Sequence, residues 1–394
     1  MRVAIVQQRV DVRRGGAETS TIEMARCLAQ TGLDVTIVCQ PPHPHTDDDL
    51  VFLPVAVPRW PRTMQAVRFV RGADRLCQEG GFDIVHAITP CLAANVYQPR
   101  GGTYAQTIKR GLALTSSPVL RGVKRIGRLF NSRQQYLNRL EHTLLTRHRN
   151  RVTVAALSDY VRRQVESGLA FPPERIRVVF NGVDVAPLSD EERARHRADL
   201  RARLQLDAGT PLVLFAAHNF KLKGLAELIR AAAIDPASHS ANPWTLAVAG
   251  RDNPRPYERL ARRLGVAERV QFRGTSVPIR AWYAAADALA HPTWHDPCSR
   301  VVLESLCLGL PAVTTRYNGA AEVIEPDRHG EVVEGPGDIR GLAAAIDRVL
   351  QPAVRKACLA DASRFREQFS MARHAEQLAL LYEEILADSA PGGV

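Results

Sequence analysis

Short apolar runs alternate with segments of helical periodicity in two series along the chain, and this alternation constrains the fold more than any other feature. RVAIVQ and DVTIVCQ in the first half, and PLVLFAA and WTLAVAG in the second, are each followed by a helical pattern or a turn. Strands that alternate with helices form parallel sheets covered by helices on both faces. We therefore predict an α/β protein with two Rossmann-like, doubly wound parallel-sheet domains that face each other across a cleft.

The polar stretch APLSDEERARHRADLRARLQLDAGTP separates the two series and is typical of a connector that contains a helix. It divides the chain into an N-terminal domain, 1–185, and a C-terminal domain, 186–369. We expect a last helix, at about 370–390, to pack back on the first domain. In open parallel sheets ligands bind beyond the carboxyl ends of the strands, so we expect the functional residues at those ends.

Composition excludes several classes of protein. With 45% hydrophobic and 24% charged residues, the chain fits neither a disordered protein nor a membrane bundle. It contains no run of eighteen apolar residues and starts directly with a strand, so we expect neither a spanning helix nor a signal peptide. Seven scattered cysteines without a CxxC or Cys/His cluster indicate reduced core thiols. Together these features predict a cytoplasmic protein.

The net charge of +11 is concentrated in one segment. Residues 100–151 contain twelve Lys or Arg and a single acid, Glu141, together with apolar residues at helical spacing. Such a segment can lie on an anionic membrane surface, bind nucleic acid or form a solvated helical face. No helix-turn-helix, RNP or zinc pattern accompanies the charge, which argues against nucleic acid. Between the other two possibilities we favour the membrane surface.

The stretch HDPCSRVVLESLCLGLPAVTT, residues 295–315, places two acids around a predicted helix. We expect Asp296 to cap this helix and Pro297 to occupy its first position. In one interpretation Asp296 only caps, and Glu304 only pairs with Arg300 one turn earlier. In the other, the free N–H groups at the helix start bind a diphosphate, and the acids lie roughly 12 Å apart along the axis. They could then accept hydrogen bonds from a ribose and a hexose, as in a nucleotide-sugar.

Three further motifs follow predicted strands. Gly15 and Gly16 open the first helix, where a glycine pair lets the backbone approach a ligand; a tight turn is the alternative. Lys221 and Lys223, in HNFKLKG, begin a helix and suit a diphosphate; a solvated lysine pair is the alternative. His86, at the end of FDIVHAI, is equally consistent with an acceptor contact and with a structural role.

We predict no metal site and no catalytic thiol. The acids of TDDDL, residues 46–50, are typical of a solvated loop, and the histidines of HPH, residues 43–45, have no partner at ligand spacing. Cys298 stands at the predicted helix start, where the pKa of a thiol can fall, but no base accompanies it in a recognisable pattern. The absence of GxGxxG argues against a dinucleotide.

With these motifs in place, the chain resembles the retaining family-4 glycosyltransferases of GT-B fold over nearly its full length. The acid-x7-acid motif followed by GLPAVTT is the specific feature, and GGAE, FNGVD, KLKG, and AGRDNP with VQFRGT support it. Within that family the chain is most similar to the lipopolysaccharide core glucosyltransferases, through NFKLKG, GRDNPRPYERLARRLGV and the Arg-rich first half.

The resemblance implies roles for these residues. Glu304 would hold the ribose hydroxyls, Asp296, where the family usually has Glu, would contact the donor sugar, and Lys223 would bind the diphosphate. Lys223 and Asp296 are thus the candidate catalytic residues, and backbone around Val270–Arg273 would read the base. The predicted donor-binding residues are Gly15, Gly16, Asn219, Lys221, Lys223, Gly250, Arg273, Asp296, Cys298, Ser299, Arg300 and Glu304.

On the acceptor side the chain departs from the family. Many members carry a His after the fifth strand of the first domain, whereas the corresponding stretch here is VYQPRGGT, with Arg100. The predicted acceptor-side residues are accordingly His86 and Arg100.

The resemblance implies a retaining, metal-independent hexosyltransferase without a cofactor. Its partners would be a UDP-sugar donor, a lipid-linked or cell-surface glycan acceptor of lipopolysaccharide type, and an anionic membrane surface bound through 100–151. It would be cytoplasmic and peripheral at the inner face of the cell membrane, with no nucleic-acid partner. The alternatives are a nucleotide-sugar epimerase of similar architecture and a non-catalytic, sugar-nucleotide-binding membrane scaffold.

Overall fold

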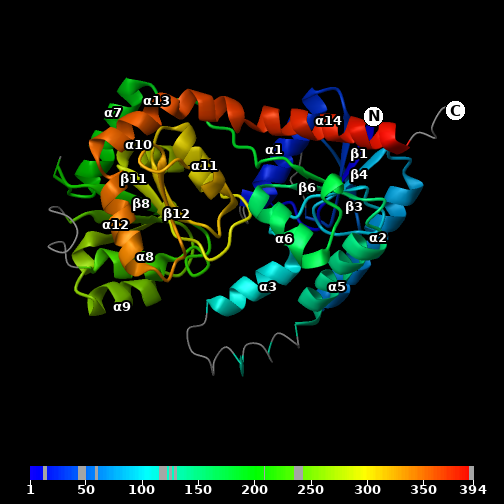
Figure 1. The fold of residues 1–394 in the computed structure, drawn as a ribbon, viewed down its shortest axis with the longest axis horizontal. Coiled ribbons are helices and arrows are strands. Elements are labelled where there is room, and N and C mark those ends of the chain that lie inside the picture. The colour runs from blue at the N-terminus through cyan, green and yellow to red at the C-terminus, as the bar shows by residue number, and fades with distance from the viewer. Residues whose placement is uncertain are drawn as a thin grey trace. The chain divides into compact units, whose positions relative to one another are not determined.

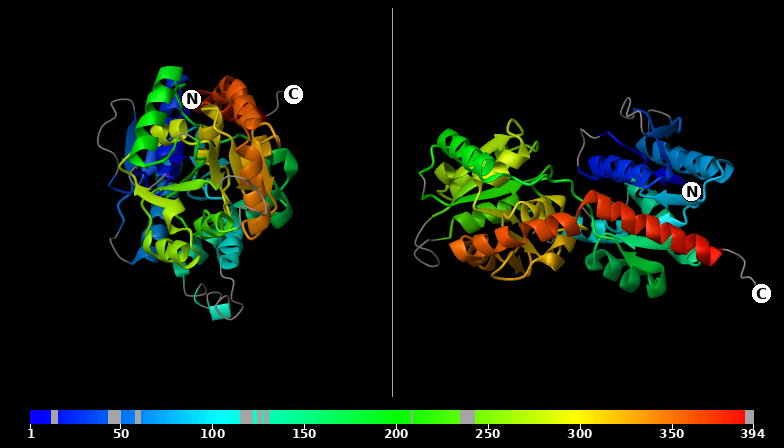
Figure 2. Two further views of the ribbon diagram at one scale, coloured as in Figure 1. Left: turned by 90° about the vertical axis from the view of Figure 1, so that its left-hand side faces the viewer. Right: turned by 90° about the horizontal axis from the view of Figure 1, so that it is seen from above.

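The computed structural model contains two compact units (Figures 1 and 2). Unit 1 comprises Met1–Gly182 and Met371–Val394, and unit 2 comprises Val183–Ser370. The sequence predicts these boundaries a few residues away, at 185/186 and 369/370. The structure describes residues 1–11, 16–42, 50–57, 61–114, 122–123, 127, 131–207, 209–234 and 243–389.

Within the described residues, unit 1 contains a seven-stranded parallel sheet in the order β3-β2-β1-β4-β5-β6-β7. Its strands are β1 (Arg2–Val6), β2 (Asp34–Cys39), β3 (Val51–Pro54), β4 (Ile84–Ala87), β5 (Val96–Tyr97), β6 (Thr153–Ala156) and β7 (Ile176–Val178). Its helices are α1 (Gly16–Gln30), α2 (Arg62–Glu79), α3 (Tyr104–Ala113), α5 (Ser132–Arg147), α6 (Asp159–Leu169) and α14 (Met371–Ser389).

Helices cover both faces of this sheet because successive residues of a strand point to opposite sides. Val3 and Ile5 of β1 belong to a core shared with α1 and α14, whereas Ala4 and Val6 belong to a core shared with α2, α5 and α6. The helices α1 and α14 lie side by side, although their sequences are at opposite ends of the chain (Figure 1). The last helix thus completes the core of the first unit.

Unit 2 repeats the architecture with a six-stranded parallel sheet, in the order β10-β9-β8-β11-β12-β13 for the residues described. Its strands are β8 (Leu212–Ala216), β9 (Thr245–Ala249), β10 (Val270–Gly274), β11 (Ala288–His291), β12 (Ala312–Thr315) and β13 (Gly330–Val333). Its helices are α7 (Asp190–Arg203), α8 (Leu225–Ala232), α9 (Arg255–Arg263), α10 (Ile279–Ala285), α11 (Arg300–Cys307), α12 (Ile339–Val349) and α13 (Pro352–Gln368). The predicted fold class, two doubly wound parallel-sheet domains, is confirmed.

The predicted connector contains the helix α7, and the carboxylate of Asp287 is one of the groups that join it to unit 2. Asp287, just before β11, accepts hydrogen bonds from Arg197 Nη2 of α7 at 2.7 Å and from Arg355 Nη1 of α13 at 2.8 Å. Its other oxygen accepts the backbone N–H of Leu212, at the start of β8, at 2.8 Å. One acid therefore joins two helices to the centre of the sheet.

Only part of the basic segment lies within the described residues. Its helix α5 packs Leu137, Leu140 and Leu144 into the core, whereas no residue of α3 is fully buried. Residues 115–121, 124–126 and 128–130 lie outside the described residues, as do Gly15, the histidines of HPH and the acids of TDDDL. None of the helices that the structure describes has the length and apolar character needed to cross a membrane.

Glu141, the acid within this segment, is buried on α5. Its carboxyl group accepts a hydrogen bond from Tyr97 Oη at 2.6 Å and one from the backbone N–H of Tyr104 at 2.7 Å. It therefore links α5 to the end of β5 and to the start of α3. Burial raises the pKa of Glu141 to about 7, against the lowering effect of these two hydrogen bonds.

We expect Glu141 to make the free energy of unfolding fall as the pH rises from about 4.5 to about 7. In this interval the native state keeps the Glu141 proton, whereas the unfolded chain has lost it, so that raising the pH favours unfolding. Urea unfolding at several pH values should show a flatter dependence for Glu141→Gln than for the wild type. The control Glu383→Gln, at an exposed position of α14, should keep the wild-type slope. Equal slopes in all three proteins would contradict the assignment.

Candidate functional site

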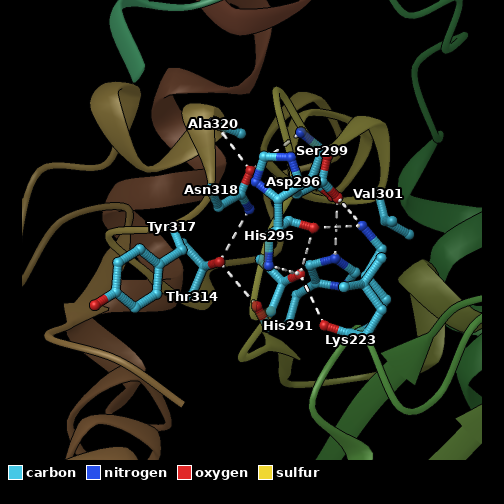
Figure 3. Close-up of polar contacts among 12 residues, drawn as sticks. Lys223, His291, His295, Asp296, Ser299, Val301, Thr314, Tyr317, Asn318 and Ala320 are labelled. Atoms are coloured by element: carbon cyan, nitrogen blue, oxygen red, sulfur yellow. Dashed lines mark hydrogen bonds and ion pairs between the residues drawn. The ribbon is translucent and has the colours of Figure 1, made fainter. Parts of the chain in front are cut away.

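The carboxyl ends of β8, β11 and β12 meet at one edge of the unit 2 sheet, and polar side chains follow each of them (Figure 3). Lys223 comes from the loop after β8, Asp296 from the loop after β11, and Asn318 from the loop after β12. Parallel strands place their carboxyl ends on the same edge, which is why residues about 70 to 100 positions apart can meet here.

Lys223 and Asp296 form an ion pair with little access to solvent. Lys223 Nζ lies 2.5 Å from Asp296 Oδ2, and the two side chains are 19% and 12% exposed. Burial by itself would raise the pKa of Asp296, but the Lys223 ammonium and a hydrogen bond from His291 hold it below its usual range. Asp296 is therefore a carboxylate at neutral pH. Its other oxygen, Oδ1, accepts no hydrogen bond from the residues that the structure describes.

Backbone packing between two loops holds this pair together. The backbone N–H of Trp294 donates to the Leu222 carbonyl at 2.9 Å, and Thr293 Oγ1 donates to the same oxygen at 3.2 Å. Gly224 follows Lys223 with φ +82°, and a Cβ at this position would collide with the carbonyl oxygen of Pro292. Glycine is required both for the left-handed backbone and for the close approach.

The prediction that Asp296 caps a helix is wrong. The helix α11 begins at Arg300 with Ser299 as its N-cap, so Pro297 does not occupy the first helical position either. The backbone of Asp296 instead bridges to the loop after β12: its N–H donates to the Tyr317 carbonyl, and its carbonyl accepts the N–H of Gly319, each at 2.9 Å. The backbone of Asp296 is thus paired with this loop and its Oδ2 with Lys223. Because Asp296 lies before the start of α11, the expected 12 Å separation from Glu304 along the helix axis does not apply.

Asn318 fixes the start of α11. Its Oδ1 accepts the backbone N–H groups of Ser299 at 3.1 Å and Ala320 at 3.0 Å, and its Nδ2 donates to Thr314 Oγ1 at 2.9 Å. Although Ser299 occupies the N-cap position, its Oγ makes no capping hydrogen bond; it is buried and has no partner among the residues described. The N–H groups of a first helical turn have no acceptor within the helix, so this end of α11 presents donors and a positive dipole end.

Glu304 lies one turn into α11 and is partly engaged. Its Oε2 accepts a hydrogen bond from Tyr283 Oη at 2.8 Å, and its Oε1 lies 3.6 Å from Arg300 Nε. The Arg300–Glu304 pair that was predicted as the simpler interpretation is therefore present, with Tyr283 as an additional partner. Burial, together with the Glu304 charge, raises the pKa of Tyr283 well above its usual range, so the phenol stays a hydrogen-bond donor.

The other predicted donor-side residues lie around this edge without joining the ion pair. Asn219 and Lys221 are exposed, and Asn219 Oδ1 accepts the backbone N–H of Leu222 at 3.0 Å. Arg273 is exposed on β10 and donates to Gln271 Oε1. Cys298 is buried next to Ser299.

Gly250 has a packing reason of its own. Its φ is +149°, and a Cβ there would collide with the carbonyl oxygen of Ala217 and the ring of Phe220. This glycine lets the end of β9 approach the loop after β8. The structure explains it without a ligand.

In unit 1 both acceptor-side candidates are enclosed. His86 is fully buried, and its Nδ1 lies 2.6 Å from Tyr382 Oη on α14. Burial lowers the pKa of His86 well below its usual range, with Arg100 and His374 adding to the effect. Arg100, 8% exposed, donates to Ser20 Oγ of α1 at 2.5 Å and lies 3.4 Å from His374 Nε2. For His86 the structure thus favours the structural alternative. Gly16 is the first residue of α1.

Reasoning from the sequence missed His291, Asn318 and Tyr283. His291 ends β11, so its place at a strand end was a usable signal. Asn318 and Tyr283 carry no local signal, because their partners come from other loops and helices. No three His, Cys, Asp or Glu side chains of the described part of the chain come together where they could hold a metal ion.

Two family models match the chain, one in each half. Residues 14–187 match the model described as Glycosyltransferase Family 4, and residues 210–352 match the model described as Glycosyl transferases group 1. The first match covers the unit 1 sheet from β2 to β7 but not β1, and the second covers the six described strands of unit 2.

Curated relatives match over part of their length. The chain is 33% identical over 233 residues to the D-inositol 3-phosphate glycosyltransferase of Salinispora tropica, which is 55% of this chain and 47% of that protein. It is 32% identical over 164 residues to the lipopolysaccharide glucosyltransferase WaaG of Escherichia coli, which is 42% of this chain and 44% of that protein. The chain thus spans about half the length of these relatives.

Solved structures match over nearly the whole chain. The crystal structure of WaaG superposes with a TM-score of 0.76 at 22% identity, covering 96% of this chain and 99% of that one. A structure of Anabaena HepE in complex with UDP-glucose superposes with a TM-score of 0.70 at 18% identity, covering 98% of this chain and 100% of that one. These similarities confirm the GT-B fold class.

We expect Gly224→Ala to destabilise the protein by more than the cost of its left-handed backbone. That cost alone is about 1 kcal/mol, and displacing the Pro292 backbone should add on the order of 2 kcal/mol. Gly265→Ala is the matched control, because Gly265 has φ +71° and nothing within 4 Å of an added Cβ. Urea unfolding should therefore rank wild type, Gly265→Ala and Gly224→Ala in order of falling stability. Equal losses in the two variants would show that the two loops do not pack as described.

Proposed function

We propose that this chain, which carries a glycosyltransferase family 4 domain and a glycosyltransferase group 1 domain, moves a hexose from a UDP-sugar to a glycan acceptor. The observation that carries the proposal is the Lys223–Asp296 ion pair at the strand ends of unit 2, beside the start of α11. It supplies a cation for a diphosphate and a carboxylate for sugar hydroxyls in one place.

In this proposal the donor diphosphate binds Lys223 and the first N–H groups of α11, with Lys221 as a second cation. Asp296 Oδ1, which has no partner among the described residues, accepts a hydrogen bond from a hydroxyl of the hexose. Glu304, which Tyr283 and Arg300 hold in place, accepts hydrogen bonds from the ribose hydroxyls. The backbone of β10 at Val270–Arg273 reads the base.

The proposed mechanism retains the anomeric configuration. As the bond to the hexose breaks, negative charge grows on the leaving UDP, and fixed donors stabilise such charge best. Lys223, Lys221 and the helix N–H groups provide the counter-charge in place of a metal ion. The acceptor hydroxyl attacks on the face from which UDP leaves, and passes its proton to the departing diphosphate.

The relatives suggest two different acceptors. The E. coli relative is a lipopolysaccharide glucosyltransferase and the Salinispora relative a D-inositol 3-phosphate glycosyltransferase. We propose a lipid-linked or cell-surface glycan of lipopolysaccharide type, because the excess positive charge of 100–151 suits an acceptor held at an anionic membrane. The helix α3 belongs to this segment and is half-exposed, which suits a peripheral association at the inner face of the membrane.

We expect Lys223→Ala and Glu304→Ala each to lose on the order of 100-fold in the turnover of the UDP-sugar, because each removes a fixed contact to the donor. Donor hydrolysis and transfer should be measured with UDP-glucose and UDP-galactose, with lipopolysaccharide core and D-inositol 3-phosphate among the acceptors. Lys356→Ala, at an exposed position of α13, is the matched lysine control and should keep wild-type activity. Full activity in both site variants would end the assignment.

Thermal-shift measurements with UDP, GDP and NAD separate the alternatives. Stabilisation by UDP alone, with a transfer product, supports the proposal. Stabilisation by NAD and interconversion of the two UDP-hexoses would indicate an epimerase. Binding of UDP without any product from the acceptor panel would indicate a non-catalytic scaffold.

For the basic segment, we expect reversal of four charges to abolish binding to anionic vesicles. The variant Arg121→Glu/Lys124→Glu/Arg125→Glu/Arg128→Glu loses the attraction of about 1 kcal/mol per cation near such a surface. Co-sedimentation with phosphatidylglycerol vesicles measures it. The control reverses the same number of exposed charges on α9, namely Arg255, Arg259, Arg262 and Arg263, and should bind like the wild type. Unchanged binding of the first variant would make the segment a solvated surface.

A further inference from the structure

His291 is a buried histidine whose ring has one fixed position. It ends β11 and is 1% exposed. Its ring stacks on Phe215 of β8, with 6.3 Å between the centroids and 23° between the planes. Its carbonyl accepts the hydroxyl of Thr314 at 2.8 Å and the backbone N–H of Thr293 at 2.7 Å. Both the backbone and the ring are therefore held by the sheet.

The two ring nitrogens have different surroundings. Nε2 lies 3.4 Å from Asp296 Oδ2, the same oxygen that Lys223 holds, whereas Nδ1 is buried without a partner among the described residues. Only a ring with its proton on Nε2 can donate to the carboxylate. Burial lowers the pKa of His291, although the hydrogen bond to Asp296 opposes this effect, so the neutral ring prevails at pH 7.

Lys223 and His291 both contact Oδ2 of Asp296, and a bound donor diphosphate would affect these two contacts differently. Lys223 is a cation on a flexible chain, and a diphosphate competes with Asp296 for its ammonium. His291 is neutral and buried, so a bound anion does not draw it away. At 3.4 Å its hydrogen bond is long, and such contacts shorten when a site is filled.

We propose that His291 is a positioning residue, which keeps the Asp296 carboxylate in place when the donor diphosphate engages Lys223. Asp296 Oδ1 then stays directed at the hexose while the charge of Lys223 is shared with UDP. This inference rests on the proposed donor site, and it assigns to that site a residue that touches neither the diphosphate nor the sugar.

Two substitutions separate this role from simple packing. His291→Phe keeps an aromatic ring against Phe215 but cannot donate to Asp296. His291→Gln loses the ring but carries an N–H close to the position of Nε2. If His291 acts through its hydrogen bond, His291→Gln should keep activity and His291→Phe should lose it. If His291 acts only by packing, His291→Phe should keep activity and His291→Gln should lose it.

The experiment compares UDP with the UDP-hexose that the wild type hydrolyses, chosen from UDP-glucose, UDP-galactose and UDP-N-acetylglucosamine. UDP lacks the sugar that Asp296 contacts, so its affinity by calorimetry should be unchanged in both variants, which also shows that they are folded. For the UDP-hexose we expect His291→Phe to lose about tenfold in kcat/KM, the loss of one hydrogen bond, and His291→Gln to stay within about threefold of the wild type.

The outcomes distinguish the inference from the function on which it rests. A wild-type protein that binds no UDP overturns the proposed function. A wild type that hydrolyses a UDP-hexose while His291→Phe does so equally well overturns the role of His291 alone. Activity retained with Phe but lost with Gln would assign His291 to packing. A parallel loss of UDP affinity in His291→Phe would also overturn the inference, because His291 would then support the whole site and not the Asp296 carboxylate in particular.

Discussion

The contact between the loops after β8 and β11 is the constraint on which the candidate site depends. Gly224 lets one backbone lie against the carbonyl of Pro292, and two donors from Thr293 and Trp294 close on the carbonyl of Leu222. This places Lys223 on Asp296 and keeps both at the edge of the sheet. A cation and a carboxylate that neutralise each other can be kept largely out of water, ready for an anion that competes for the cation.

The organisation of both units, and the position of Lys223 at a strand end of unit 2, could be predicted from the sequence, because local patterns carry them. Alternating runs predict the strands, Lys223 follows from a motif at a predicted strand end, and Glu304 belongs to the acid-x7-acid motif around a predicted helix. The error at Asp296 shows where local rules fail. Asp-Pro is a good start for a helix, but a bridge to the loop after β12 and an ion pair with the loop after β8 prevail over capping. Both competing partners come from distant parts of the chain.

The same limit applies to unit 1. Arg100 comes just after β5 and His86 lies on β4, and from the sequence both are candidates for acceptor contacts, yet His374 and Tyr382 of α14 meet them in the interior. Nothing in the neighbourhood of VYQPRGGT or FDIVHAI announces a helix nearly 300 residues later. A resemblance to a family predicts where a residue lies along a strand, whereas its surroundings depend on how the ends of the chain pack.

The return of α14 to unit 1 has a consequence for how the protein is made. Ribosomes deliver the chain from its N-terminus, so β1, β2 and α1 emerge long before the helix that covers Val3, Ile5 and Leu28. Throughout the synthesis of unit 2 this apolar face remains open to water and to other nascent chains. A message truncated after unit 2 would therefore yield a polypeptide in which unit 2 is complete and unit 1 exposes an apolar surface. Such a polypeptide would be a substrate for chaperones and proteases.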